Sequence, residues 1–552
     1  MTATVNATID ATAPAALDTM MTATMTDGPE SPIAGLKGNV VDYLFEQRLG
    51  TEEAARPYLV LPERNFSFGE MHRRVCQVGR LLQSLGVQPG DRIMFSVRDG
   101  IDFPAIFLGA MKIGAVALPI NTFLQANDYA YYVKDSGASV LIVDHELVAK
   151  IEPIRGDATF PRDLFVVGRD AAGCRRFEDE VEAQPGDLAT VPRQPDDTGF
   201  WLYSSGSTGD PKGVVHTHAH IYWATELFGI ATLGLAATDT ILCPPKMFFA
   251  FGLGAQLYFA LRTGAAVIVE AQPVKPQAVL GHLVQHRPTV LIGVPTLYAG
   301  MIDLMRGMEP TARREAASRL RLCISGGEVL PATVNRNWKE STGTEILDGV
   351  GTTELTHMFM INRPGAVVSG SCGTIVAGYS ARFLDEDHRD VPPGEIGNLF
   401  ISGPTAARSY WNKSEKTAAT MWDGGVLTGD KCYRDDEGNF FYVGRVDDML
   451  RVGGVWVSPA EVESVLTEHE GVLECAVIGV ADENEMIKPK AFVVARQGQA
   501  VSAAFEESVR TLLRSRLAHI KCPRWIEFVP ELPKTATGKI QRFRLRAAEA
   551  GR

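Results

Sequence analysis

The sequence lacks the features that define several common classes of protein. Its eight cysteines are scattered and form no Cys-x-x-Cys pair, so neither zinc sites nor disulfides are indicated and a reducing cytoplasm fits best. Basic residues number 54 against 66 acidic ones, a net charge of −12 that disfavours nucleic acid as a partner. The most apolar long segment, residues 247–261, contains Gln256 and is too short to cross a membrane. We therefore expect a cytoplasmic protein with no membrane or nucleic-acid partner.

The first residues also lack the marks of a targeting signal. Residues 1–31 are rich in Ala, Thr and Met but have neither a basic start nor a continuous apolar core, which predicts a disordered tail. At 552 residues the chain is too long for one hydrophobic core, and its 45% hydrophobic and 22% charged composition is that of ordinary globular proteins. At least two domains are expected.

Strand-like and helix-like segments alternate through much of the first 350 residues. This alternation predicts parallel α/β layers, whose ligands collect at the carboxyl ends of the strands. The expected helices are residues 68–85, 103–112, 126–135 and 276–285, and the expected strands are residues 92–97, 115–119, 139–143, 198–202, 265–270, 289–294, 321–325 and 345–347.

A loop with the sequence YSSGSTGDPKG, residues 203–213, follows the strand at 198–202 and has the composition of a phosphate-binding loop. Its glycines permit φ > 0 and close backbone approach, while its hydroxyls donate hydrogen bonds and its lysine adds charge. The alternative is a Ser/Gly-rich surface turn. The spacing of glycine and lysine excludes a Walker loop. The residues concerned are Ser204, Ser205, Gly206, Ser207, Thr208, Gly209, Lys212 and Gly213.

Two later loops also follow strands. Ser-Gly-Gly-Glu at 325–328 could equally be a plain turn before a helix. The stretch DGVGTTE at 348–354 is more informative, because Thr353 can donate to a phosphate oxygen and Glu354 can hold Mg²⁺. A simple helix N-terminus is the alternative for that pair.

The texture changes after residue 379 to short strands broken by Pro and Gly, which predicts an antiparallel β subdomain. It carries Thr-Gly-Asp, ending at Asp430, and Arg445, a carboxylate and a guanidinium suited to ribose hydroxyls. Beyond residue 448 we expect a separate domain of about 105 residues. Its expected elements are a hairpin at 449–457, helices at 459–466 and 501–517, strands at 472–480 and 491–495, and an exposed basic tail, PKTATGKI, at 533–540.

Taken together and in this order, the motifs resemble those of the acyl-adenylate-forming superfamily, which includes acyl-CoA synthetases, luciferases and peptide-synthetase adenylation domains. Within it the chain looks most like the aryl-CoA ligases. The resemblance implies a multidomain α/β fold. A large N-terminal domain, residues 32–446, would contain two α/β subdomains and a β subdomain, and a small mobile α+β domain would span residues 447–552.

The resemblance also implies roles for single residues, with ATP and coenzyme A as substrates and Mg²⁺ as cofactor. Thr353, Glu354 and Lys539 would be catalytic, Glu354 as the metal ligand and Lys539 at the adenylation transition state. Asp447 would be the hinge. ATP would contact Ser204, Ser205, Gly206, Ser207, Thr208, Gly209, Lys212, Gly327, Glu328, Asp348, Gly349, Val350, Gly351, Thr352, Asp430 and Arg445. Arg451, Gly453, Gly454 and Trp456 would form the pantetheine tunnel when the small domain rotates.

A small aromatic carboxylate such as benzoate is the expected acid. Aromatic walls with small residues between them leave a slot for a ring, although Phe-rich stretches are also typical of plain core. Two positions depart from the family pattern: Val350 replaces a frequent aromatic residue beside adenine, and Phe249 replaces a frequent gate histidine. The expected acyl pocket consists of Phe228, Phe249, Ala250, Ser325, Gly326 and His357.

Several alternatives stay open at this point. A medium-chain acyl-CoA synthetase would share the same chemistry, and a stand-alone adenylation enzyme would load a carrier protein instead of coenzyme A. A luciferase-like oxidase would use the same adenylate with O₂. The sequence also leaves open whether the chain forms a homodimer.

Overall fold

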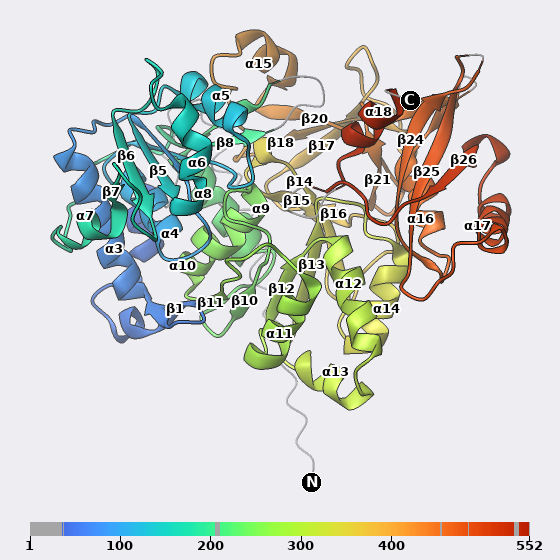
Figure 1. Ribbon diagram of the computed structural model, residues 1–552, viewed down its shortest axis with the longest axis horizontal. Coiled ribbons are helices and arrows are strands. Elements are labelled where there is room, and N and C mark those ends of the chain that lie inside the picture. The colour runs from blue at the N-terminus through green and yellow to red at the C-terminus, as the bar shows by residue number, and fades with distance from the viewer. Residues whose placement is uncertain are drawn as a thin grey trace.

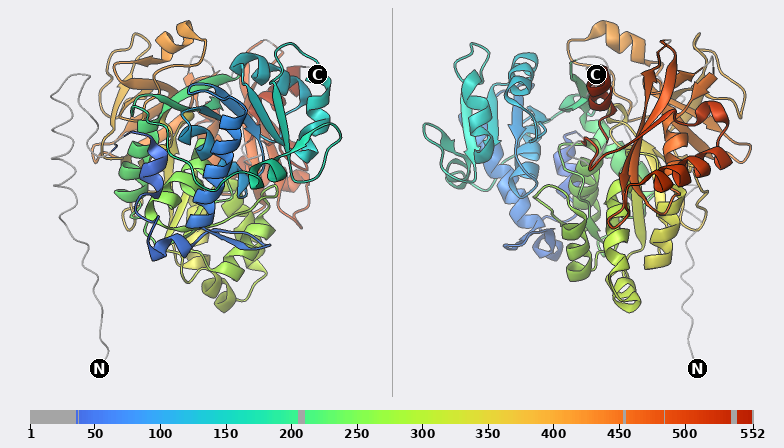
Figure 2. Two further views of the ribbon diagram at one scale, coloured as in Figure 1. Left: turned by 90° about the vertical axis from the view of Figure 1, so that its left-hand side faces the viewer. Right: turned by 45° about the vertical axis from the view of Figure 1, so that its right-hand side comes forward.

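The computed structural model describes residue 36 and residues 38–204, 210–452, 455–483, 485–534 and 540–550. Within these ranges, three sheets belong to a large N-terminal part and two to a smaller C-terminal part (Figure 1). The seven-stranded sheet and the C-terminal strands lie on opposite sides of the molecule (Figure 2). The predicted multidomain α/β architecture is confirmed.

The first sheet has seven strands in the order β7-β6-β5-β3-β4-β8-β9. All neighbouring pairs are parallel except β8 and β9, which form an antiparallel hairpin. Its strands are β3 (Arg92–Ser96), β4 (Val116–Pro119), β5 (Val140–Asp144), β6 (Asp163–Val167), β7 (Arg175–Arg176), β8 (Thr198–Ser204) and β9 (Lys212–Thr217).

Alternating side chains along these strands reach two different cores. Ile93 and Phe95 join the large core that also includes α3 (Phe68–Ser84) and α4 (Asp102–Lys112), whereas Met94 joins a second core with α5 (Ala126–Ser136). Helices on both faces explain why the central strands β3, β4 and β5 are almost wholly buried.

The second sheet has nine strands in the order β16-β15-β14-β13-β12-β10-β11-β1-β2. Its central strands are parallel, and antiparallel strands lie at both edges. Its strands are β1 (Pro57–Val60), β2 (Asn65–Ser67), β10 (Thr240–Leu242), β11 (Ala266–Ile268), β12 (Val290–Gly293), β13 (Leu322–Gly326), β14 (Ile346–Gly351), β15 (Met358–Ile361) and β16 (Thr374–Ile375).

One face of this sheet is covered by helices, and the other packs into the large core of the N-terminal part. Helices α11 (Pro276–His286), α12 (Pro295–Arg306) and α14 (Ala332–Thr342) cover one side and form a core of their own. The opposite side contributes to the large core together with the seven-stranded sheet and the β subdomain. One continuous core therefore fixes the three N-terminal subdomains relative to one another.

The β subdomain is antiparallel, as predicted, and consists of β17 (Ser380–Leu384), β18 (Gly397–Ser402), β19 (Met421–Trp422), β20 (Gly425–Arg434) and β21 (Phe440–Arg445). The C-terminal part begins with the hairpin β22 (Leu450–Val452) and β23 (Val455–Val457). It continues with the three-stranded sheet of β24 (Val472–Ala481), β25 (Ile487–Ala495) and β26 (Trp525–Phe528).

Helices cover both faces of this small sheet. Helices α16 (Pro459–Leu466) and α17 (Ala503–Arg516) pack in one core and α18 (Arg542–Ala550) in another. The remaining α-helices of the described chain are α2 (Val40–Phe45), α6 (Val148–Ile151), α7 (Phe177–Glu182), α8 (His218–Ala224), α9 (Ala250–Leu253), α10 (Phe259–Thr263), α13 (Pro310–Ala316) and α15 (Ser414–Thr420).

The cysteines contribute no cross-links. All eight are free thiols, and six of them are buried. Among the described residues, no helix combines the length and the hydrophobicity that crossing a bilayer requires.

Gly252 on α9 provides a test of how closely this helix packs. A Cβ at this position would lie 2.2 Å from the carbonyl oxygens of Pro245 and Lys246, which are backbone atoms that cannot swing away. Gly252→Ala should therefore lower the free energy of unfolding by about 1–3 kcal/mol or more in urea titrations. Gly281→Ala on α11 is the matched control, because nothing lies within 4 Å of its Cβ. That control should stabilise by roughly 0.5–1 kcal/mol, and equal effects of the two substitutions would contradict this packing.

Candidate active site

A cavity of about 1800 Å³ lies between the large N-terminal part and the C-terminal part. Its wall includes residues from every motif singled out in the sequence that the structure describes: Ser204, Lys212, Gly326, Gly327, Glu328, Asp348, Gly349, Val350, Gly351, Thr352, Thr353, Glu354, Asp430 and Arg445. Its volume exceeds the roughly 300–1,000 Å³ of a typical single-ligand pocket. The cavity can therefore hold more than one substrate group.

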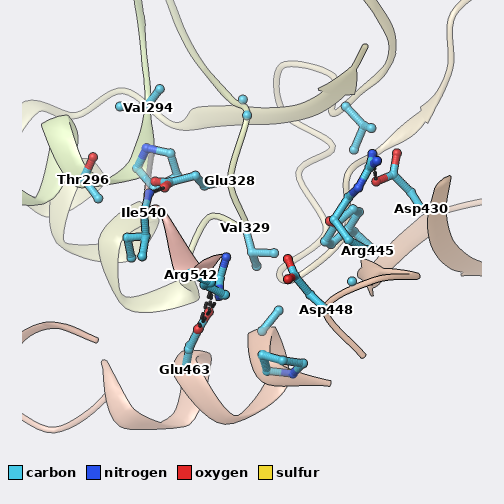
Figure 3. A pocket seen from close by; sticks show the side chains of 18 of the residues that line it. Val294, Thr296, Glu328, Val329, Asp430, Arg445, Asp448, Glu463, Ile540 and Arg542 are labelled. Carbon is cyan, nitrogen blue, oxygen red and sulfur yellow. Dashed lines mark hydrogen bonds and ion pairs between the residues drawn. The ribbon is translucent and has the colours of Figure 1, made fainter. Parts of the chain in front are cut away.

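One corner of the cavity is an ion pair between neighbouring strands. Asp430 on β20 lies opposite Arg445 on β21, and Arg445 Nη1 donates to Asp430 Oδ1 over 3.0 Å (Figure 3). The same nitrogen donates to the Thr428 carbonyl over 3.0 Å, which fixes the guanidinium. Burial raises the pKa of the Asp430 carboxyl and the charge of Arg445 opposes that rise, while Asp430 raises the pKa of Arg445. A held carboxylate of this kind can accept hydrogen bonds from two adjacent hydroxyls.

A second corner is built around the Glu354 carboxylate. Glu354 Oε1 accepts hydrogen bonds from Ser204 Oγ, 3.2 Å away, and from the Tyr410 hydroxyl, 2.9 Å away. Lys212 Nζ lies 4.5 Å from the centroid of the Tyr410 ring. Burial lowers the pKa of Lys212, and the charge of Glu354 opposes that fall. No sequence motif marks Tyr410, which contacts Glu354 only because the fold brings the two together.

This corner could hold a divalent cation only with help from a ligand. The described residues contain no group of three or more His, Cys, Asp or Glu side chains placed to bind a metal. Mg²⁺ typically keeps few protein ligands and completes its shell with phosphate oxygens and water, so a single carboxylate such as Glu354 suits it.

The predicted phosphate loop joins the two antiparallel strands β8 and β9. Ser204 on β8 pairs with Lys212 on β9, so both side chains lie at the base of the connection. Gly213 belongs to β9 and does not adopt a positive φ. A glycine is favoured there by close packing, because a Cβ would lie 3.3 Å from the Cβ of Trp411. Ser205, Gly206, Ser207, Thr208 and Gly209 lie outside the described residues.

The stretch at 348–351 lies on a strand, not on the predicted loop. Strand β14 continues to Gly351 because it pairs with β15 beyond the point where the sequence pattern ends. Asp348 there pairs with Ser325 on β13, and both side chains are buried. Burial raises the pKa of Asp348 to about 8. Gly327 has φ +87°, which a side chain would strain, so the predicted turn at this position is confirmed.

The aromatic wall of the cavity is formed by Phe249, Ala250, Phe251, Gly326 and His357. Burial lowers the pKa of His357 to about 3, and its Nε2 donates to the Phe251 carbonyl over 3.3 Å.

Two predicted pocket residues do not belong to this wall. Phe228 lies on a π-helical turn, Thr225–Ile230, that directs its ring against His357, 4.8 Å between centroids, so it lies behind the wall. Ser325 is fully buried and does not line the cavity.

A buried ion pair supports the aromatic wall from behind. Lys246 and Asp99 are each 3% exposed, with 3.9 Å between Nζ and Oδ2. Asp99 Oδ1 accepts from the Met247 backbone N–H over 3.1 Å, and Lys246 Nζ donates to the Gln272 carbonyl over 2.7 Å. These contacts fix the chain that leads into Phe249. The sequence patterns did not single out either residue for this role.

The C-terminal part closes the cavity on its other side. The backbone N–H of Ile540 donates to Glu328 Oε1 over 3.0 Å, which brings the segment next to position 539 to the cavity edge (Figure 3). Asp447 lies in the turn between β21 and β22 and lines the cavity. Arg451 is an exposed residue of β22. Lys539, Gly453 and Gly454 lie outside the described residues, and Trp456 is described only by its place on β23.

Fold and site together define an α/β protein whose cavity has polar corners at Asp430–Arg445 and at Glu354, an aromatic wall, and a small C-terminal part that closes over them. Comparison with known proteins gives the family. A model described as AMP-binding enzyme matches residues 45–411, and one described as AMP-binding enzyme C-terminal domain matches residues 461–539. Because the first covers more than half of the chain, this protein belongs to the AMP-binding enzyme family.

Particular relatives are similar over almost the whole chain. A benzoate–CoA ligase of Thauera aromatica is 44% identical over 512 residues, 92% of this chain and 96% of the relative. The solved structure of a benzoate CoA ligase from Burkholderia xenovorans LB400 matches with a TM-score of 0.85 and 40% identity, covering 92% of this chain and 99% of that one. The anthranilate CoA ligase AuaEII, in complex with anthranoyl-AMP, matches with a TM-score of 0.88 and 40% identity over 93% of this chain and 98% of its own.

The raised pKa of Asp348 predicts a pH dependence of stability. Folding lifts this pKa from about 3.9 in an unfolded chain to about 8, so the folded state binds more protons than the unfolded state between those values. Stability contributed by this group is full below the unfolded pKa and is lost as the pH rises toward 8. Asp348→Asn removes the titrating group, so its unfolding free energy relative to wild type should increase between pH 5 and pH 8.

Urea unfolding of the ligand-free protein at pH 5, 6.5 and 8 measures this difference. Asp170→Asn is the control, since the Asp170 side chain is 92% exposed. A constant difference between Asp348→Asn and wild type across this range would show that Asp348 titrates normally.

Proposed function

We propose that this protein is an ATP-dependent aryl-CoA ligase whose acid is benzoate. It would join benzoate to ATP, giving benzoyl-AMP and pyrophosphate, and would then transfer the benzoyl group to coenzyme A with release of AMP. One observation carries the proposal: a single cavity holds the Asp430–Arg445 pair, the Glu354 carboxylate and the Phe249–Phe251 wall. The names of the similar ligases for benzoate and anthranilate support an aromatic acid.

The nucleotide would be held from two sides. Asp430, fixed by Arg445, would accept the ribose hydroxyls, while Ser204, Lys212 and Thr353 would donate to phosphate oxygens. The loop residues Ser205, Gly206, Ser207, Thr208 and Gly209 belong to the same proposed phosphate site. Gly327, Glu328 and residues 348–352 would surround the adenine, with Val350 as an aliphatic contact in place of an aromatic one.

The acid would occupy the aromatic slot with its carboxylate toward the α-phosphate. Phe249, Ala250, Gly326 and His357 would enclose the ring, and the neutral imidazole of His357 adds no charge to an apolar site. Dry, rigid walls would also keep water away from the mixed anhydride.

In the first step a carboxylate oxygen attacks the α-phosphorus, the new O–P bond forms, the bond to the bridging oxygen breaks and pyrophosphate leaves. Two anions must approach, so donors placed where negative charge grows lower the barrier. Lys539 and Thr353 are the proposed donors. Glu354 would hold Mg²⁺, which supplies charge neutralisation on the phosphates, and Ser204 and Tyr410 would orient that carboxylate.

In the second step the thiolate of coenzyme A attacks the acyl carbon, the C–S bond forms and the C–O bond to AMP breaks. We place the boundary between the two domains at residues 446 and 447, with a mobile C-terminal domain pivoting at Asp447. Arg451, Gly453, Gly454 and Trp456 would then replace Lys539 at the cavity and form the pantetheine tunnel. A pivot is needed because two segments cannot occupy one place.

Product analysis tests the proposed reaction. With ATP and Mg²⁺ present, benzoate should cause pyrophosphate release, and benzoyl-CoA and AMP should accumulate once coenzyme A is added. The kcat/KM for benzoate should exceed that for octanoate by about tenfold or more, because a linear chain fills a flat aromatic slot poorly. Release of ADP and phosphate would refute adenylation, and a preference for octanoate would refute the aryl assignment.

Separate assays of the two half-reactions test the division of labour. Lys539→Ala should slow benzoate adenylation by about 10²-fold or more, as the loss of one transition-state donor does, and should leave thioester formation from supplied benzoyl-AMP nearly intact. Asp447→Pro should act in the opposite way, because proline fixes φ and hinders the pivot. Lys521→Ala is the control, since Lys521 pairs with Glu461 and neither residue lines the cavity. Equal losses in both steps for Lys539→Ala would contradict this assignment.

A further inference from the structure

Thr356 has a backbone conformation that its residue type strongly disfavours. Its φ is +65° with ψ −36°, in a residue that is β-branched and fully buried. Side chains branched at Cβ are rarely found at positive φ, and such outliers persist only where surrounding contacts force them. Thr356 lies two residues after Glu354 and directly before His357.

The hydroxyl of Thr356 is held from two sides. Its Oγ1 lies 3.2 Å from His216 Nδ1 and donates to the Thr405 carbonyl over 3.3 Å. The His216 nitrogen also lies 3.0 Å from His220 Nδ1, which accepts from the Thr217 backbone N–H over 3.4 Å. Since His220 Nδ1 accepts there, a hydrogen on His216 Nδ1 would be donated to His220 and to Thr356. Burial lowers the pKa of His216 to about 3, so this imidazole is neutral at ordinary pH.

Every backbone carbonyl from Thr353 to Thr356 has a donor. The Thr356 N–H donates to the Thr353 carbonyl over 3.1 Å, and the Ala407 N–H donates to that of Glu354 over 2.8 Å. The Leu355 carbonyl accepts from Thr405 Oγ1 over 2.8 Å, and Tyr258 donates to the Thr356 carbonyl over 3.4 Å. Four donors therefore determine the path of this turn: one from the turn itself, two from residues 405–407 and one from Tyr258.

The turn directs its side chains into the cavity from two directions. Before Thr356, Thr353 and Glu354 line the cavity at the Glu354 corner. After it, His357 lines the aromatic wall. An ordinary right-handed residue at position 356 would continue the short 3-10 helix, Thr353–Leu355, and would rotate Glu354 relative to Ser204 and Tyr410.

We propose that Thr356 is a positioning residue for adenylation: its left-handed backbone, held by His216 and Thr405, sets the direction of Thr353 and Glu354. The inference rests on the proposed role of Glu354 in holding Mg²⁺ against the phosphates. Thr356 itself touches no substrate, so its effect reaches the reaction only through the orientation of those two side chains.

The test compares two substitutions at Thr356. Thr356→Val keeps the branched shape and removes the hydroxyl, so both of its contacts are lost, whereas Thr356→Ser keeps the hydroxyl. In acid-dependent pyrophosphate release, Thr356→Val should lower kcat/KM for ATP by about tenfold or more and should raise the Mg²⁺ concentration needed for half-maximal rate. Thr356→Ser should stay within about threefold of wild type.

Thr342→Val is the matched control. Thr342 is also a buried threonine, and its Oγ1 donates to the Trp338 carbonyl over 2.8 Å on α14. The control should lose thermal stability as Thr356→Val does while keeping wild-type kinetics. If Thr356→Val does not fold, Thr405→Val provides the same kinetic readout, because it removes the donor to the Leu355 carbonyl.

Glu354→Gln distinguishes a failure of the proposed Mg²⁺ site from a failure of the positioning role of Thr356. Loss of Mg²⁺-dependent pyrophosphate release in Glu354→Gln and in Thr356→Val, with rescue by serine, supports the inference. Loss in Glu354→Gln with wild-type kinetics in Thr356→Val overturns the positioning role alone. Wild-type Mg²⁺ dependence in Glu354→Gln overturns the proposed metal site and the inference with it.

Discussion

One carboxylate oxygen connects the three subdomains of the N-terminal part. Glu354 follows β14 of the nine-stranded sheet. Its Oε1 accepts from Ser204 at the end of β8 in the seven-stranded sheet and from Tyr410, between β18 and β19 of the β subdomain. Two hydrogen bonds to one ionisable group stabilise a fold more than surface ion pairs do only where water is excluded and the geometry is fixed. The shared hydrophobic core beneath fixes the geometry, while Glu354 itself is half-buried at the cavity wall. The placement of the other cavity residues depends on this junction.

Two ion pairs with buried carboxylates hold backbone segments at or behind the cavity wall. Asp430 with Arg445 and Asp99 with Lys246 are pairs in which each carboxylate is buried and burial raises its pKa. Such pairs contribute little net stability, because desolvation offsets their attraction. These pairs instead hold the backbone in place. Arg445 donates to the Thr428 carbonyl, and Asp99 accepts from the Met247 N–H, so each segment has one favoured position.

Much of the fold and part of the site could be predicted from the sequence, because both depend on local patterns. The periodicity of residues 459–466 predicted helix α16 to the residue, and the glycine-rich and acidic motifs located Glu354, Asp430 and Arg445. Contacts between distant segments could not be predicted: Tyr410 meets Glu354 across 56 positions and Thr356 meets His216 across 140. Phe228 was expected in the acyl pocket, but its ring packs against His357 and does not line the cavity. Position 356 carries no local signal for positive φ, because the strain is imposed by tertiary contacts.

The burial of the free cysteines affects how a thioester-forming enzyme avoids modifying itself. Cys372 and Cys475 both line the cavity, yet burial raises the pKa of each thiol well above its usual value. A thiol must lose its proton to become a strong nucleophile or to exchange with a disulfide. The mixed anhydride formed in the cavity therefore meets no competing protein thiolate, and oxidised coenzyme A has no reactive partner there. The packing that buries these two side chains therefore disfavours both their acylation and their exchange with a disulfide.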